Sequence, residues 1–250
     1  MLPLRLALGL SGASPRLVAT LLVATALRSC LTYEFEHEFW LRTDGSGSVN
    51  VTGRPALWTS FKSLRLEEKA DVEVMKNAAR ELFERSGLRV RRVTVTRRGG
   101  HRYLFVSADF ADVNRISYTP AFPDLRVGLR HEDGRLHLDG SWQRPLEALD
   151  AGKVDREGLV AVRFHLPSKV YSHRNAADGV ERGNILSWRE ETGAALDGGR
   201  LDLGAVTDPR SILFSTIMLF AGAVVLAVLL LALALWAVVR RGRRDLANSS

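Results

Sequence analysis

The sequence has very little of what marks most enzymes and disulfide-stabilised domains. Its 250 residues include one cysteine, Cys30, so no disulfide can form within the chain. It contains no G-x-S-x-G elbow, no G-x-x-x-x-G-K-S/T phosphate loop and no G-x-G-x-x-G fingerprint. The familiar hydrolase, NTPase and dinucleotide sites therefore lack support. We expect neither an enzyme nor a bound cofactor.

The net charge is small between the two ends of the chain. The formal net charge is +7, of which three arginines in residues 1–30 supply +3. Four arginines and one aspartate in residues 240–250 supply another +3, which leaves +1 for the residues between. A nucleic-acid-binding domain carries a basic surplus as well as a basic patch. We therefore expect no nucleic-acid partner.

A long apolar run lies near the C-terminus. Ile212 to Val239 contains no ionisable side chain, and about 20 apolar residues suffice to cross a bilayer. Asp208 and Pro209 precede it as a cap and a first-turn proline, and a buried core helix would seldom stay apolar over so many turns. A basic cluster follows, which favours the cytoplasmic side: Arg240, Arg241, Arg243 and Arg244. The sequence predicts a transmembrane helix over 209–239, a cytoplasmic basic tail over 240–250 and a single-pass protein with its N-terminal domain outside the cell membrane.

An N-terminal domain outside the membrane needs an export signal. Leu17 to Leu27 is an apolar run behind two arginines and is too short to span, which is typical of a signal peptide. The segment 27–30 resembles a bacterial lipobox, in which Cys30 is acylated, although Arg28 stands where lipoboxes favour a small or aliphatic residue. Ala24 and Ala26 offer an ordinary cleavage pattern instead. Residues 1–30 are thus expected to be a signal peptide, with Cys30 as a lipidation site or a plain thiol. Export without disulfides points to a bacterial envelope.

Alternating apolar and polar residues predict three β-hairpins within residues 31–208. The predicted strand pairs are Leu31–Leu41 with Ser48–Gly53, Leu88–Arg98 with His101–Ala108, and Leu125–His131 with Arg135–Trp142. Two single strands are expected at Leu159–Leu166 and Ile185–Arg189. The conformation of Pro55–Phe61 is left open.

A period of 3.6 residues over Leu66–Ser86 predicts a long amphipathic helix, with Met75 and Phe83 on its apolar face. This face most simply packs against the sheet; the second interpretation is that it covers a ligand in an apolar cleft. A short helix is expected from Asp109 to about Ser117. The order of these elements predicts an α+β domain, an antiparallel sheet of hairpins with both helices on one face.

Two groups of side chains are candidates for binding. The third hairpin carries metal-ligand residue types, although no known ligand spacing supports a metal there and solvated turn residues explain them as well. These are His131, Glu132, His137 and Asp139. The second hairpin carries six arginines, which either contact an anionic head group through their guanidiniums or protect a sheet edge against strand addition. These are Arg89, Arg91, Arg92, Arg97, Arg98 and Arg102.

Four short segments resemble the LppM domain of bacterial envelope lipoproteins. They are Phe164–Val170, Asn175–Ala176, Gly183–Trp188 and Asp208–Ser211, in that family's order and spacing. The resemblance implies the same layout: a signal peptide with a lipobox, an α+β domain and one C-terminal membrane helix. It also implies a role in binding lipids or glycolipids. It carries over no site residue, because Pro167, Asn175 and Trp188 are equally explained by a turn and a core tryptophan.

The expected function is therefore binding rather than turnover. We expect a membrane-anchored bacterial cell-envelope protein whose extracytoplasmic domain, residues 31–208, binds a lipid, a glycolipid or another amphiphile, with the basic hairpin at its charged head. The alternative is an assembly or scaffold protein that acts through contacts with an unidentified protein partner. An envelope hydrolase would need His131, His137 and Asp139 to converge in a polar cleft.

Overall fold

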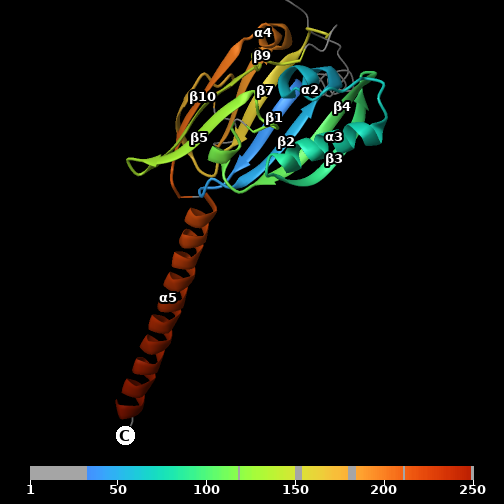
Figure 1. The fold of residues 1–250 in the computed structure, drawn as a ribbon. Coiled ribbons are helices and arrows are strands. Elements are labelled where there is room, and N and C mark those ends of the chain that lie inside the picture. Colours follow the sequence, from blue (N-terminus) through green and yellow to red (C-terminus); the bar gives the residue numbers. More distant parts are fainter. Residues whose placement is uncertain (1–32, 118, 150–153, 180–183, 211, 249–250) are drawn as a thin grey trace, which may run out of the picture. The chain divides into compact units, whose positions relative to one another are not determined.

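The computed structural model describes residues 33–117, 119–149, 154–179, 184–210 and 212–248. The predicted signal peptide, residues 1–30 with Cys30, lies outside these residues. The described chain combines two largely antiparallel sheets with a few helices and one C-terminal apolar helix (Figure 1). The predicted α+β class is confirmed, and the strands divide over two sheets where the pattern suggested one.

The larger sheet has six strands in the order β3-β4-β2-β1-β7-β9, and the smaller has four in the order β5-β6-β10-β8. The strands of the larger sheet are β1 (Tyr33–Leu41), β2 (Gly47–Gly53), β3 (Arg89–Arg98), β4 (His101–Phe110), β7 (Leu159–His165) and β9 (Ile185–Glu191). Those of the smaller sheet are β5 (Leu125–Glu132), β6 (Arg135–Gln143), β8 (Val170–Arg174) and β10 (Arg200–Thr207). The three predicted hairpins are confirmed as β1–β2, β3–β4 and β5–β6, each antiparallel.

Period-two alternation gives β1 one buried and one part-exposed face. Phe35, His37 and Phe39 have no exposed surface, and the residues between them are partly exposed. At the turn into β2, Gly45 has φ +81°, a conformation that glycine adopts without strain. The Asp44 carboxylate accepts the backbone N–H of Ser46 at 2.9 Å and fixes the turn. The hairpin register therefore follows from the pattern and the turn together.

β1 and β7 are neighbours whose contacts run in the same direction along both strands. Glu34, near the start of β1, lies beside Gly158, just before β7. Glu38 contacts His165, at the end of β7, at 2.8 Å. This pattern is that of parallel strands, which is why the larger sheet is largely and not wholly antiparallel. The ends of β1 and β7 consequently lie at the same end of the sheet.

Four helical segments connect the strands: α2 (Pro55–Lys62), α3 (Val72–Arg85), the 3₁₀ helix η1 (Val113–Arg115) and α4 (Thr192–Leu196). The predicted long helix is α3, which begins after Asp71 because that carboxylate accepts the N–H of Glu73 at 2.8 Å and caps the helix. The predicted short helix is reduced to η1 and is capped by Asp112, because β4 continues past Asp109 to Phe110. Pro55–Phe61, for which the sequence predicts no conformation, belongs to α2.

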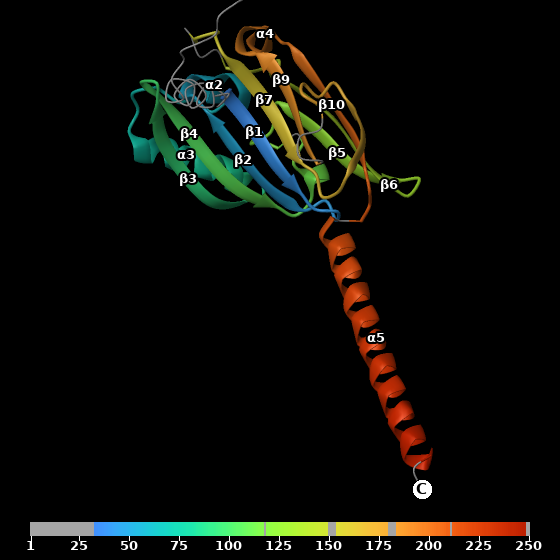
Figure 2. The same cartoon turned by 180° about the vertical axis from the view of Figure 1, so that it is seen from behind.

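Aromatic side chains join the two sheets and the helices into one core. On α2, the Phe61 ring lies 5.1 Å from Phe35 of the larger sheet and 4.9 Å from Trp142 of the smaller. Figure 1 shows α2 and α3 over one face of the larger sheet, and Figure 2 shows the opposite face, which no described helix covers. Met75 and Phe83 of α3 have no exposed surface, so core packing is confirmed for this helix and its apolar face lines no open cleft.

The C-terminal helix α5 (Ile212–Asn248) is long and apolar enough to cross a membrane. Its apolar part, Thr216–Trp236, has a mean hydropathy of 3.0 and is not buried against the rest of the protein. Helical backbone continues through the predicted tail to Asn248. The predicted apolar helix is confirmed, while the orientation of the chain across a membrane stays a prediction.

Candidate functional site

Chain connectivity identifies the end of the larger sheet that lies nearest α5. The Asp208 N–H donates to the carbonyl of Lys169 at 3.2 Å, four residues beyond the end of β7. Ile212, where α5 begins, follows Asp208 by four residues, a reach of at most about 14 Å. Trp40 stacks on His165 at 4.7 Å, so the end of β1 lies here too. We call this the span-proximal end.

A cavity of about 330 Å³ at the span-proximal end is lined by three arginines and one aspartate, among other residues. Arg42 follows β1, while Arg89 and Arg91 lie at the start of β3. Arg89 donates to Asp109 Oδ2 through Nη2 at 2.6 Å and Nε at 3.1 Å, and Arg91 Nη2 lies 2.5 Å from Oδ1. Arg42, Arg89 and Arg91 are all exposed, and we call them the proximal arginines. With Asp109 they leave a net charge of +2 on the cavity wall.

Asp109 acts as the positioning group of this cluster. Partial burial alone would raise the pKa of its carboxyl, but hydrogen bonds and charge from Arg91 and Arg89 outweigh burial and hold the pKa below its usual value. The carboxylate therefore stays ionised and keeps both guanidiniums close together. An anion that enters the cavity meets two arginines already placed, and a third on the neighbouring turn.

The six arginines predicted from the sequence do not form one cluster. Arg97, Arg98 and Arg102 lie around the Gly99–Gly100 turn, and nine residues of strand, about 30 Å, separate Arg89 from Arg98. Arg98 lies 5.3 Å over the Tyr103 ring, and Arg102 donates to the carbonyl of Ala70 at 2.6 Å. Arg92 is exposed on the strand between the two groups. A single head group can therefore contact only part of the predicted set.

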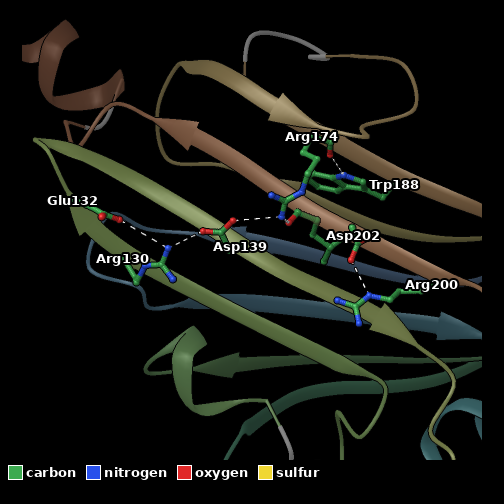
Figure 3. A network of polar contacts seen from close by, with 8 residues as sticks. Arg130, Glu132, Asp139, Arg174, Trp188, Arg200 and Asp202 are labelled. Carbon is green, nitrogen blue, oxygen red and sulfur yellow. Dashed lines mark hydrogen bonds and ion pairs between the residues drawn. The ribbon is translucent and has the colours of Figure 1, made fainter.

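The predicted metal-ligand set is divided between the two faces of the β5–β6 hairpin. His131 pairs with Leu136, while His137 pairs with Arg130 on the other face. Figure 3 shows Asp139 turned toward Arg130 and Arg174, at 3.0 Å and 3.4 Å. Within the residues that the structure describes, no group of three His, Cys, Asp or Glu side chains could hold a metal ion. The convergence that an envelope hydrolase would need is not formed.

A buried polar cluster lies in the core between the sheets, and the sequence pattern gave no sign of it. Lys62 Nζ contacts Asp124 Oδ1 at 2.6 Å, and the Trp142 indole donates to Oδ2 at 2.8 Å. The side chains of Lys62, Asp124 and His37 have no exposed surface, and His37 Nε2 lies 3.4 Å from Asp124 Oδ2. Lys62 is the last residue of α2. Because the sequence pattern did not predict this helix, it could not place Lys62 in the core.

Burial dominates the titration of this cluster. It lowers the pKa of Lys62 to about 8, against the attraction of Asp124. It raises the pKa of Asp124, against Lys62 and Trp142. It also lowers the pKa of His37, and the nearby Lys62 lowers it further. Although His37 lies near the Asp124 carboxylate, Lys62 already engages that group, and the imidazole is neutral near pH 7.

The segments that carry the family resemblance join the two sheets to each other and to α5. The Trp188 indole on β9 donates to the Arg174 carbonyl on β8 at 2.6 Å, as Figure 3 shows. The Asn184 amide donates to the Leu166 carbonyl at 2.8 Å, and the Ser168 hydroxyl donates to the carbonyl of Asp208. Their contacts are structural.

No family model matches the chain, and no curated protein matches it. Among solved structures, it is similar to the folded domain of the Mycobacterium tuberculosis LppM protein, determined by NMR. The identity is 14%, the TM-score is 0.39, and the match covers 75% of this chain and 98% of that domain. This is a distant likeness of fold.

Proposed function

We propose that this chain is a membrane-anchored bacterial envelope protein whose extracytoplasmic domain binds the anionic head group of a lipid or glycolipid. The observation that carries the proposal is the position of the proximal arginines at the end of the larger sheet nearest α5. A domain tethered by so short a connection holds this end close to the membrane surface.

The chemistry of the cavity suits a phosphate-bearing head group. Guanidinium groups bind phosphate oxygens through pairs of hydrogen bonds, and near an anionic surface each basic residue contributes about 1 kcal/mol. The cavity wall keeps a surplus of positive charge after Asp109 is counted. The apolar face of α3 is buried in the core, so it offers no surface to the acyl chains. We expect the acyl chains to stay in the bilayer. Binding therefore requires only the head group to enter the domain.

Lipid retention by the full-length protein tests this proposal. The protein is reconstituted in nanodiscs of phosphatidylcholine with a minority of phosphatidylglycerol, and the lipids kept after release are identified by native mass spectrometry. The wild type should retain phosphatidylglycerol preferentially. Arg89→Gln with Arg91→Gln should weaken this retention roughly thirtyfold, which corresponds to about 2 kcal/mol for two arginines.

The matched control removes the same charge from the far end of the same hairpin. Arg97→Gln with Arg98→Gln should leave the retention of phosphatidylglycerol close to that of the wild type. Equal losses in the two double variants would show diffuse attraction and contradict the proposed contact. A wild type that retains no anionic lipid, but crosslinks at fixed stoichiometry to one envelope protein, would favour the scaffold function instead.

A further inference from the structure

Tyr171, near the start of β8, is an aromatic side chain that the domain leaves open to its surroundings. Its exposed fraction is 49%. The structure describes three other exposed large apolar side chains outside α5, which are Val72, Val74 and Leu146. Among these four, Tyr171 alone carries an aromatic ring, which makes it the largest apolar group on this surface.

Two contacts hold the exposed ring in place. The Tyr171 hydroxyl donates to Asp208 Oδ2 at 2.9 Å, and the guanidinium of Arg135, which begins β6, lies 4.6 Å over the ring. Asp208 Oδ1 also accepts the backbone N–H of Arg210 at 2.8 Å. These hydrogen bonds, first that from Arg210 and then that from Tyr171, hold the pKa of the Asp208 carboxyl below its usual value. The ring is therefore fixed to the segment that leads into α5.

This segment lies at the level where a bilayer has its head groups. The apolar part of α5 begins at Thr216, and the helix rises about 6 Å from Ile212 to Thr216. The head-group layer is about 5–7 Å thick on each side of the hydrocarbon core. Asp208 lies at most about 14 Å from Ile212 along the chain. Tyr171, which is bonded to Asp208, is thus held within reach of the head groups.

The chemistry of Tyr171 and Arg135 suits this layer. Tyrosine is enriched at membrane interfaces because its ring is apolar and its hydroxyl is polar, and arginine combines an apolar stem with a charged end. Residues 132–135, 169–171 and 208–210 carry three basic and three acidic side chains: Arg135, Lys169 and Arg210 with Glu132, Asp133 and Asp208. These charges balance, so the surface around the ring requires no anionic lipid.

We propose that Tyr171 and Arg135 form a second membrane contact, resting in the head-group layer of the bilayer that α5 crosses. The partner is the bilayer surface and not a lipid taken into a cavity. A weak contact suffices, because the tether through α5 keeps the surface at a high effective concentration. Tyr171 and Arg135 belong to the smaller sheet, whereas the proximal arginines adjoin the larger. The two contacts together would fix the tilt of the domain.

This inference rests on the membrane anchoring in the proposed function, but not on the binding of an anionic head group. The experiment therefore uses nanodiscs of phosphatidylcholine alone. Full-length protein with Cys30→Ala, which removes the single cysteine of the chain, receives one new cysteine that carries an NBD fluorophore. A phosphatidylcholine with a nitroxide on its head group quenches any fluorophore at the membrane surface.

The label at Glu132→Cys reports on the proposed contact, because Glu132 pairs with Arg135 at the end of the β5–β6 hairpin. The label at Arg97→Cys reports on the far end of the larger sheet. We expect quenching at residue 132 to be several-fold stronger than at residue 97. Equal quenching at the two residues would overturn the contact.

Changes at Tyr171 separate a true contact from mere tethering. Tyr171→Ser removes the ring, so quenching at residue 132 should fall toward the level at residue 97, while Tyr171→Phe should keep most of it. Val74→Ser is the matched control, because Val74 is 61% exposed and lies at the start of α3. It should leave the quenching unchanged. If Tyr171→Ser also leaves it unchanged, the tether alone brings residue 132 to the membrane, and the proposed role of the ring is wrong.

A label within α5 keeps the failure of this inference distinct from the failure of membrane anchoring. Leu226→Cys lies in the apolar part of the helix and should be quenched by a nitroxide placed midway along the acyl chain. Quenching at residue 226 without excess quenching at residue 132 would overturn the second contact and leave the anchoring intact. No quenching at residue 226 would contradict the anchoring itself, and this contact with it.

Discussion

Lys62 is held in the core by Asp124, and each charge would be costly to bury without the other. Lys62→Met leaves an unpaired carboxylate among aromatic rings, so we expect the free energy of unfolding to fall by about 3–5 kcal/mol. Lys62→Met with Asp124→Asn removes both charges and keeps an acceptor for the Trp142 indole. The double variant should recover most of the loss. Urea unfolding of the full-length protein in detergent, followed by tryptophan fluorescence, measures both.

Lys76→Met provides the comparison for this experiment. Lys76 pairs with Glu73 at 2.7 Å on the exposed side of α3, and exposed pairs contribute about 0–1 kcal/mol. Lys76→Met should therefore lower the free energy of unfolding only slightly. A double variant as unstable as Lys62→Met alone would show that packing at these positions, and not the buried charge, governs the cost.

His37 couples the stability of the core to pH. Its pKa lies well below the usual value, because burial disfavours the imidazolium and Lys62 repels it. As pH falls below about 6.5 the unfolded chain takes up a proton that the folded chain does not, so the free energy of unfolding decreases. Between pH 7 and pH 5.5, protonation of His37 in the unfolded chain should lower the free energy of unfolding by about 1 kcal/mol. His37→Phe should remove this pH-dependent loss of stability. The site can accept a phenyl ring, because the imidazole already packs 5.2 Å from the Phe35 ring.

The comparison for His37 is the exposed His101 at the β3–β4 turn. Chemical unfolding at pH 7 and at pH 5.5 is measured for the wild type, His37→Phe and His101→Phe. The His101 variant should keep the pH dependence of the wild type. If His37→Phe keeps it as well, protonation of other groups accounts for the acid sensitivity and the assigned role of His37 is wrong.

At the scale of elements, the sequence predicted the helices and strands that bury only one face. One buried face produces a regular spacing of apolar residues, which the sequence shows. β1 alternates strictly because one face meets the core and the other does not, and α3 has a polar side because it covers only one surface. α2 was missed for the opposite reason. Seven of its eight residues are buried, so no polar face marks a helix. β10 was missed because Gly204 and Ala205 interrupt its apolar pattern where both neighbouring strands pack closely.

The segments with the family resemblance could be found in the sequence, but their role could not. Trp188 and Arg174 lie on edge strands of different sheets, and the hydrogen bond between them exists only because both sheets close on one core. The same holds for Asp208, which Lys169 and Ser168 fix just before α5. A local pattern shows only the order of these residues along the chain. The tertiary structure shows that they join the sheets and fix the chain just before α5.

At the scale of the whole molecule, hairpin position decides which arginines can act together. The sequence placed six on one hairpin, and a hairpin of ten-residue strands separates its ends by about 30 Å. Arg42, which no local pattern marked, joins Arg89 and Arg91 because β1 ends on the side of the sheet where β3 begins. Asp124, Arg126 and Arg144 likewise meet Arg200 through pairing of distant strands. The sequence shows where the arginines lie along the chain, while topology decides which of them lie together in one site.

The positions of the two ends of β1 bear on Cys30. From the sequence, Cys30 is either an acylated residue or a plain thiol. β1 begins at Tyr33 and ends at the span-proximal end, about 26 Å away along the strand. Cys30 is three residues before Tyr33, a reach of about 10 Å. An acyl chain on Cys30 in the membrane would pull the start of β1 to the surface, and Arg97 and Arg98 with it. The head-group contact through the proximal arginines alone therefore predicts that Cys30 is not acylated.

Intact mass of the full-length protein, expressed in a bacterial host that exports it, tests this prediction. The masses of the wild type and Cys30→Ala should differ only by the change of side chain, with the same N-terminus. A wild type heavier by an acyl-bearing group, with Cys30 as its first residue, would contradict the prediction. It would require the strands of the larger sheet to lie along the membrane surface, because both ends of β1 would then be tied there. In that arrangement Arg97→Gln with Arg98→Gln would weaken lipid retention as much as the change at Arg89 and Arg91.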